Sequence, residues 1–208
     1  MQESKKPKLV LLDFDGTLMD SDIFLDFIAF RLIDYRMWWR LLLALPYIVA
    51  YKLKLMKNDE AKEKVFGAFF KGESEAYFLN STEQFWYHHG TDINPAIVER
   101  ISDYQKEQAE FLIVSANFAP IIQSFASRNY RFDFLATEIE VIDGKLSGRF
   151  ASLNCHGKEK VRRLDIRIFN REQYSAVHAY GDSAGDLPML RWADEGFMLT
   201  NGSWRKIR

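Results

Sequence analysis

Two aspartates lie two residues apart in the segment Asp13-Phe14-Asp15-Gly16-Thr17. Carboxylate oxygens are ligands that Mg²⁺ prefers, and two carboxylates on one loop can converge on a single cation. Gly16 allows a tight turn and lets backbone N–H groups approach a phosphate. The same segment also fits a solvated acidic turn, so its chemistry depends on partners from elsewhere in the chain.

A second acidic cluster follows much later, where Asp182 and Asp186 lie four residues apart in the sequence GDSAGD. We expect Asp182 to complete the oxygen shell of a cation shared with the first cluster, and Asp186 to orient a bound water or a neighbouring lysine. Asp186 taken alone could equally be the N-cap of a helix that starts near Leu187. The presence of both acidic clusters favours the cation site.

Polar and basic residues complete a candidate phosphate site. The Ser115 hydroxyl and the backbone amides of Ala116 and Asn117, at the end of LIVSAN, suit the oxygens of a phosphoryl group, although Ser115 also fits a helix N-cap. Lys158 and Lys160, in GKEKVRRL, lie just before or within a predicted helix. Either lysine could supply the positive charge that stabilises a pentavalent transition state. Both are equally compatible with solvated surface charges.

Short apolar runs precede the two acidic clusters and Ser115, and we interpret them as buried parallel strands. The predicted strands cover residues 8–14, 110–115, 176–180 and 197–200, with helical stretches between them. Strands that alternate with helices predict an α/β fold with a doubly wound parallel sheet. Parallel sheets bind ligands at the carboxyl ends of their strands, so the sheet would bring the candidate residues together.

A long helical segment separates the first two predicted strands and is far longer than a simple crossover. We interpret residues 21–90 as a helical cap domain inserted into an α/β core made of residues 1–20 and 91–208. Residues 91–108 would return the chain to the core. Residues 135–150 alternate apolar and polar side chains around Asp143-Gly144, which predicts a β-hairpin.

The motifs in their order resemble the haloacid dehalogenase superfamily: DFDGT, a serine after the second strand, a lysine ahead of a helix, and GDSxxD. The resemblance covers nearly the whole chain and implies a Rossmann-like fold. It further implies that Asp13 attacks phosphorus, that Asp15 protonates the leaving alcohol and then activates water, and that Mg²⁺ bridges carboxylate and phosphate. The superfamily's dehalogenases lack the second aspartate, so Asp15 favours a phosphatase.

The same resemblance assigns the remaining roles. It implies that Mg²⁺ is held by the Asp13 carboxylate, the Asp15 backbone carbonyl and Asp182, with Asp186 in support. The phosphate would contact Thr17, Ser115 and one lysine. In subfamily IB, which has a helical cap after the first motif and includes phosphoserine phosphatases, the pattern C-x-G-x-E-K-V often carries this lysine. This pattern matches residues 155–161 and assigns the role to Lys160. The phosphoserine enzymes tend to have the pattern G-K-x-K-V, so Lys158 remains an alternative for the same role.

Composition limits the partners and the compartment. The 208 residues carry a formal net charge of −1, which argues against a nucleic-acid partner. Cys155 is the only cysteine, which rules out an intramolecular disulfide and favours a reducing compartment. The N-terminal sequence MQESKKPK lacks the pattern of a signal peptide, so we expect a cytoplasmic protein.

Residues 36–57 have an apolar centre flanked by basic residues, with Trp38 and Trp39 at one edge. The apolar run is too short to span a bilayer, which takes roughly 20 residues. This composition is typical of an interfacial segment, which would contact the inner membrane face. The arrangement resembles the phosphatidylglycerophosphatase C group, and on this reading the substrate is a lipid headgroup. Otherwise the apolar residues form the core of the cap, and a small phosphorylated metabolite such as phosphoserine is the substrate.

Two other functions remain open at the level of sequence. A phosphotransferase would pass the phosphoryl group from the same covalent intermediate to an acceptor other than water. A catalytically silent phosphate-binding protein would keep the fold and lose turnover, but its expected sign is loss of Asp13 or Asp15, and both are present. The sequence does not predict an oligomeric state.

Overall fold

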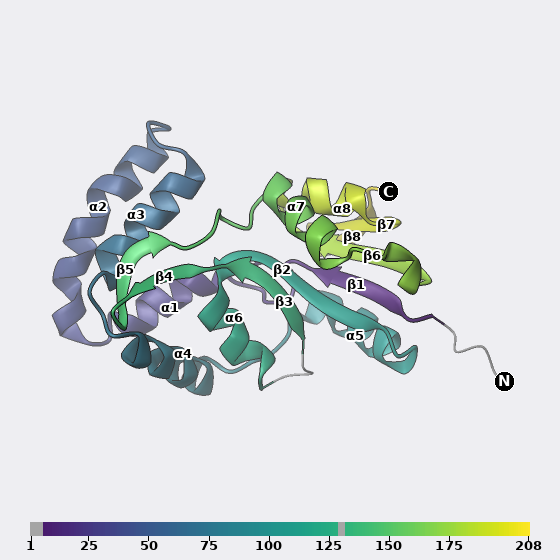
Figure 1. Cartoon of the computed structure of the whole chain (residues 1–208), viewed down its shortest axis with the longest axis horizontal. Helices are drawn as coiled ribbons and strands as arrows, with labels where there is room; N and C mark the ends of the chain where they lie inside the picture. Colours follow the sequence, from purple (N-terminus) through teal and green to yellow (C-terminus); the bar gives the residue numbers. More distant parts are fainter. Residues whose placement is uncertain (1–5, 129–131) are drawn as a thin grey trace.

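The computed structural model describes residues 6–128 and 132–208 and contains a six-stranded sheet in the order β3-β2-β1-β6-β7-β8 (Figure 1). Its strands are β1 (Lys8–Leu12), β2 (Glu110–Phe118), β3 (Asp133–Thr137), β6 (Ala176–Gly181), β7 (Glu195–Thr200) and β8 (Ser203–Lys206). Neighbouring strands are parallel except for the β7–β8 pair. The predicted α/β class with a parallel sheet is confirmed.

Helices cover both faces of this sheet. They are α5 (Pro95–Lys106), α6 (Ala119–Ala126), α7 (Lys158–Arg167) and α8 (Leu187–Trp192). Alternate residues of β1 enter different hydrophobic clusters, Val10 with residues of α5 and α6, and Leu11 with Leu164 of α7 and Leu190 of α8. Because successive strand residues point to opposite faces, the run KLVLL packs on two helical layers at once.

The strand order places β1 at the centre, between β2 and β6. Leu12, the last residue of β1, pairs in register with Ile113 of β2 and with Tyr180 of β6. The segments that follow these three strands therefore leave the same edge of the sheet. Asp13 and Asp182 lie in these segments, and Ser115 lies in the last part of β2 near the same edge.

Residues 21–90 contain α1 (Ile23–Arg31), the 3₁₀ helix η1 (Tyr35–Met37), α2 (Trp38–Lys52), α3 (Asn58–Phe70) and α4 (Glu75–His89). Phenylalanine rings of α1, α3 and α4 pack together in the interior, with Phe27 in contact with Phe70, Phe78 and Phe85. Aromatic packing of this kind stabilises a core beyond the area that it buries. We propose that these helices form the cap.

The predicted hairpin is present as β4 (Ile139–Ile142) and β5 (Lys145–Phe150), an antiparallel pair outside the main sheet. Asp143 and Gly144 both have positive φ, as a two-residue type I′ turn requires. The hairpin packs on α3, where the Cα of Gly67 faces the backbone of Gly148 so closely that a Cβ on Gly67 would lie 2.8 Å from the Gly148 carbonyl oxygen. In Figure 1 the hairpin lies beside α3, at the end of the molecule where α1 to α4 gather.

Several predicted boundaries were wrong. The first strand ends at Leu12 and not at residue 14, because Leu18 and Met19 donate backbone hydrogen bonds back to residues 13 and 14 and close a loop. The second strand continues to Phe118. Residues 135–137 belong to β3 of the main sheet and not to the hairpin, since an alternating pattern does not mark where the chain changes sheets.

No helix within residues 6–128 and 132–208 is long and apolar enough to cross a bilayer. Residues 1–5, which belong to the N-terminal sequence used to argue against a signal peptide, lie outside the described residues.

Candidate active site

Asp13 and Lys160 form the buried centre of the candidate site. Asp13 follows β1 and is 7% exposed, and Lys160 lies in the first turn of α7 and is 1% exposed. The Lys160 Nζ lies 2.5 Å from Asp13 Oδ1 and 2.6 Å from Asp186 Oδ1. Lys160 therefore joins the first acidic cluster to the second through charge-assisted hydrogen bonds.

The three groups hold different charges because their surroundings differ. Burial raises the pKa of Asp13 to about 8, with Lys160 acting in the opposite direction. Burial also opposes ionisation of Lys160 and Asp186. Attraction to Asp13 and then Asp186 outweighs it for Lys160, whose pKa lies above its usual value, and attraction to Lys160 outweighs it for Asp186, whose pKa lies below its usual value. Lys160 and Asp186 are thus an ion pair, whereas Asp13, with its raised pKa, tends to hold a proton unless a further cation offsets its charge.

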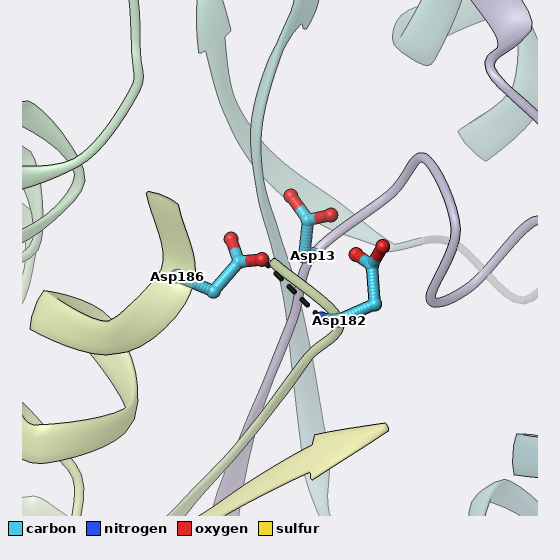
Figure 2. Close-up of side chains that lie close together, drawn as sticks. All are labelled: Asp13, Asp182 and Asp186. Atoms are coloured by element: carbon cyan, nitrogen blue, oxygen red, sulfur yellow. Dashed lines mark hydrogen bonds between the residues drawn. The ribbon is translucent and has the colours of Figure 1, made fainter. Parts of the chain in front are cut away.

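Carboxylate oxygens of Asp13, Asp182 and Asp186 lie within 4.8 Å of one another, and Figure 2 shows them facing a common space. The oxygens of Asp186 are already bonded: Oδ1 to Lys160, and Oδ2 to the N–H and the hydroxyl of Ser183. Asp182 accepts a hydrogen bond from the Thr17 hydroxyl at 3.1 Å, and burial together with Asp186 raises its pKa.

This donor set fits a hard divalent cation. Two carboxylates with raised pKa values face each other, and a cation of charge +2 with oxygen ligands would offset their repulsion. Asp13 and Asp182 are the carboxylates placed to contact such an ion, whereas the bonds of Asp186 make it a support for Lys160 and for the loop before α8.

Two glycines allow the acidic loops to meet. Gly16 has φ +76°, and a Cβ at this position would lie 2.4 Å from Asp182 Oδ2. A Cβ on Gly181 would lie 2.4 Å from the Asp186 Cβ. Any side chain at either position would push the carboxylates apart, so these glycines determine the spacing of the site.

Asp15 lies in a different environment from Asp13. Its Oδ1 accepts hydrogen bonds from the Ile23 N–H at 2.9 Å and from Asn117 Nδ2 at 3.0 Å. Burial raises the pKa of Asp15 to about 6, and the nearby Lys62 acts against this rise. A carboxyl group with such a pKa can carry a proton or release it near neutral pH, as an acid–base catalyst must.

Of the other predicted residues, Ser115, Ala116, Asn117 and Thr17 lie at the site, and Lys158 does not. Ser115 is buried, and its hydroxyl accepts the Asn117 N–H at 2.9 Å, so that amide is already paired. The Ala116 carbonyl accepts a hydrogen bond from Lys62, and Thr17 bonds to Asp182. Lys158 is exposed at the start of α7, away from the acidic cluster that Lys160 enters.

Lys62 of α3 lies beside the site and was not predicted from the sequence. Its Nζ donates to the Ala116 carbonyl at 2.8 Å, and it interacts electrostatically with Asp15 and Asp22, while burial lowers its pKa. No sequence signal marks this lysine, because it lies in a helix with other lysines and far from the motifs. It brings a positive charge from the predicted cap to the edge of the sheet.

Asp15 and Lys62 line a cavity of about 460 Å³ between α1, α2 and α3. Most of its remaining lining is apolar: Phe24, Leu25 and Ile28 of α1, Leu41, Ile48 and Tyr51 of α2, and Ala61, Val65 and Phe69 of α3. The cavity is therefore polar where it meets Asp15 and apolar along the helices.

Most of the chain is similar to a known family and to a known protein. A model of the family described as haloacid dehalogenase-like hydrolase matches residues 10–191. The protein CicA of Caulobacter vibrioides is 31% identical over 207 residues, which covers 95% of this chain and 88% of the relative. The range of the family match contains Asp13, Asp15, Lys160 and Asp182.

Solved structures have a similar fold at low sequence identity. A Bordetella pertussis Tohama I protein of unknown function has a TM-score of 0.75 at 20% identity, with 91% of this chain and 88% of that chain covered. A phosphoserine phosphatase solved as a phospho-aspartyl intermediate analogue has a TM-score of 0.59 at 20% identity, with 93% and 86% covered.

Proposed function

The chain belongs to the haloacid dehalogenase-like hydrolases, and we propose that it is a Mg²⁺-dependent phosphomonoesterase that forms a phospho-aspartate on Asp13. The observation that carries this proposal is the pairing of two different carboxylates at one sheet edge. Asp13 contacts a buried lysine, and Asp15 contacts Asn117 and the Ile23 amide. The helical segment after the first motif supports placement in subfamily IB.

In the first half of the reaction, a carboxylate oxygen of Asp13 attacks phosphorus and the ester P–O bond breaks. The leaving oxygen takes the proton that Asp15 carries, and an alcohol departs. Lys160 holds Asp13 in place and offers positive charge beside the transferring phosphoryl group. Ser115 and Thr17, both buried at the same edge, complete the proposed phosphate contacts.

In the second half, a water molecule attacks phosphorus and the bond between phosphorus and the Asp13 oxygen breaks. Asp15, now ionised, takes a proton from this water, so inorganic phosphate leaves and both aspartates return to their starting states. The Ile23 amide and the Asn117 side chain hold the Asp15 carboxylate in one orientation during both halves.

Mg²⁺ would be held by Asp13, the Asp15 backbone carbonyl and Asp182, with Asp186 in support. When bound, it supplies positive charge that offsets the phosphate oxygens. Asp186 keeps Lys160 and the loop around Asp182 in position through its four hydrogen bonds.

The cavity favours a substrate with an apolar portion. A phosphoryl group at Asp13 would leave its alcohol portion near Asp15 and Lys62, and beyond them the cavity is lined mostly by apolar side chains. The acyl chains of a lipid phosphate such as phosphatidylglycerophosphate, beyond its polar glycerol headgroup, would bury apolar surface there. Phosphoserine would place a charged amino acid against the same apolar walls. We therefore propose the lipid phosphate as substrate, presented at the cytoplasmic face of a membrane, with a small phosphorylated metabolite as the second candidate.

The test is phosphate release with Mg²⁺ from p-nitrophenyl phosphate, phosphoserine, sugar phosphates and phosphatidylglycerophosphate in detergent. We expect turnover that Asp13→Asn abolishes, with the highest kcat/KM for the lipid. Asp143→Asn, in the hairpin turn, is the matched control and should retain turnover. A folded protein that binds phosphate analogues and releases no phosphate from any substrate would point to the silent binding protein.

A phosphotransferase uses the same first half-reaction, so hydrolysis alone does not exclude it. Candidate alcohols added to the assay would divert phosphate into a new ester if the acceptor is not water. We propose hydrolysis because Asp15 is already placed to accept a proton from an attacking water.

A further inference from the structure

A second cavity, of about 760 Å³, lies between α2, α3 and β5. It shares no lining residue with the cavity that Asp15 and Lys62 line, because it faces different sides of α2 and α3. We name it the α2–β5 groove, lined among others by Trp39, Arg40, Lys64, Lys71, Ser147 and Arg149. The groove is therefore separate from the proposed path of the substrate.

The α2–β5 groove is strongly positive. Arg40, Lys64, Lys71 and Arg149 face one carboxylate, that of Glu63, whose Oε1 already accepts the N–H of Phe150. Within the described residues, none of these four cations has a carboxylate at ion-pair distance. Arg40 also lies over the Trp39 ring, 5.2 Å from its centroid. Arg40 donates to the Phe69 carbonyl, which leaves Lys64, Lys71 and Arg149 as the cations suited to an anion such as a phosphate group.

Apolar side chains of α2 continue outside the groove. Ala44 is the one fully buried residue of α2, while Leu42 is 70% exposed and Trp38 is 64% exposed. Leu45 and Val49 add to this surface. Contiguous apolar surface of this kind is rare on monomeric soluble proteins and marks an interaction site.

Charge in the same segment indicates what the partner is. Residues 36–57 contain five basic residues, Arg36, Arg40, Lys52, Lys54 and Lys57, and no acidic residue. A second copy of the chain would bring these cations against themselves, which opposes a symmetric dimer through this face. A surface that is apolar and negatively charged complements it better.

We infer that α2 and the α2–β5 groove form a docking surface for an anionic phospholipid bilayer. The groove binds a lipid headgroup phosphate through Lys64, Lys71 and Arg149, and α2 lies in the interface with Leu42 and Trp38 toward the acyl chains. Its 15 residues span roughly 22 Å, less than the ~30 Å hydrocarbon layer, so α2 lies along the surface. The inference does not depend on turnover.

Sedimentation of the full chain with vesicles tests the inference. Vesicles of phosphatidylcholine with about one-third phosphatidylglycerol, a fraction chosen to give a strong surface charge, should bind the protein at low salt and release it at high salt. Vesicles of phosphatidylcholine alone should bind it much more weakly. Lys64→Gln with Arg149→Gln should weaken partitioning by about 30-fold, which corresponds to about 1 kcal/mol for each cation.

The matched control is Lys6→Gln with Arg205→Gln, which removes two exposed cations from the α/β part of the molecule, away from the groove. It should change binding far less, and both double variants should hydrolyse a soluble ester like the parent chain. Leu42→Ser with Leu45→Ser should also weaken binding. Each of these residues is exposed, so the variants should fold.

Other results would overturn the inference. Equal binding to neutral and anionic vesicles would show that the groove does not bind anionic headgroups. Unchanged binding by Lys64→Gln with Arg149→Gln would show the same. A dimer in light scattering that Leu42→Ser with Leu45→Ser dissociates would identify a second copy as the occupant. Binding of soluble glycerol phosphate in the groove as tight as vesicle binding would identify a free anion.

Discussion

Asp13 and Asp15 are two residues apart and yet have different surroundings. Asp13 contacts the Lys160 ammonium and faces Asp182, whereas Asp15 is bonded to neutral N–H donors from Ile23 and Asn117. The first environment suits a nucleophile held near cations, and the second suits a group that must change its protonation state. The proposed division of roles thus follows from which element each side chain meets.

Asp15→Asn removes the proposed acid and base and retains the side-chain volume. We expect kcat to fall by about 10² to 10⁴, the usual contribution of such a group. The loss in the first half-reaction should be smaller for p-nitrophenyl phosphate than for an alkyl phosphate, because nitrophenolate departs without a proton. Stopped-flow release of nitrophenol measures this step, and equal losses for both esters would contradict the assignment.

Lys160→Met leaves Asp13 and Asp186 buried without their cation. We expect loss of activity and destabilisation of about 3 kcal/mol, measured by urea unfolding. Lys158→Met, two residues earlier and exposed, should stay within about 0.5 kcal/mol of the parent. If Lys158→Met abolishes turnover and Lys160→Met does not, the lysine assignment is wrong.

At the scale of elements, three strand ends, helix α7 and one helix of the proposed cap make the site. β1, β2 and β6 end at one edge of the sheet, and α7 brings Lys160 across it. Helix α3 adds Lys62, which donates to the Ala116 carbonyl in the segment after Val114 where the β2–β3 register shifts. The predicted cap therefore contributes a charged group as well as apolar cavity walls.

Lys62→Gln tests the contribution of α3. The substitution removes the ammonium that lines the cavity with Asp15 and keeps an amide that can still donate to Ala116. We expect KM for the preferred ester to rise about tenfold, with a smaller change in kcat. Lys64→Gln, on a different side of the same helix, is the matched control for steady-state kinetics on a soluble ester. An unchanged KM would show that Lys62 does not contribute to substrate binding.

Much of this arrangement could be predicted from local patterns. Strands such as KLVLL and the AVHAYG run are mostly apolar or small and end at acidic motifs, so both strands and motifs stand out. β3 and β8 do not stand out in the sequence, because DFLAT and SWRK are short edge strands with mixed polarity. Lys62 could not be predicted either, since only the packing of α3 against the core brings it to Asp15.

At the scale of the whole molecule, the fold concentrates carboxylates where a cation is needed. Asp13 has a pKa of about 8 and Asp15 of about 6, both above the usual value near 4 of an unfolded chain. Between about pH 4 and 8 the metal-free native state therefore binds more protons than the unfolded state. Its stability should fall as pH rises through this range.

Mg²⁺ should reverse this loss of stability, because it competes with protons for the same carboxylates. At a hundredfold excess over its Kd we expect about 2.7 kcal/mol, or roughly 5–10 °C in Tm. The gain should be larger at pH 8 than at pH 5 and should be lost in Asp182→Asn. Differential scanning calorimetry at both pH values measures it, and a gain that is greater at pH 5 would contradict the proposed metal site.

The central claim is that turnover passes through a phosphoryl group on Asp13. Rapid acid quenching during steady-state hydrolysis, followed by peptide mass spectrometry, tests it most directly. We predict a phosphoryl group on the peptide that contains Asp13, more of it in Asp15→Asn, and none in Asp13→Asn. An active enzyme whose quenched peptides carry the phosphoryl group on another residue, or on none even in Asp15→Asn, would contradict the account.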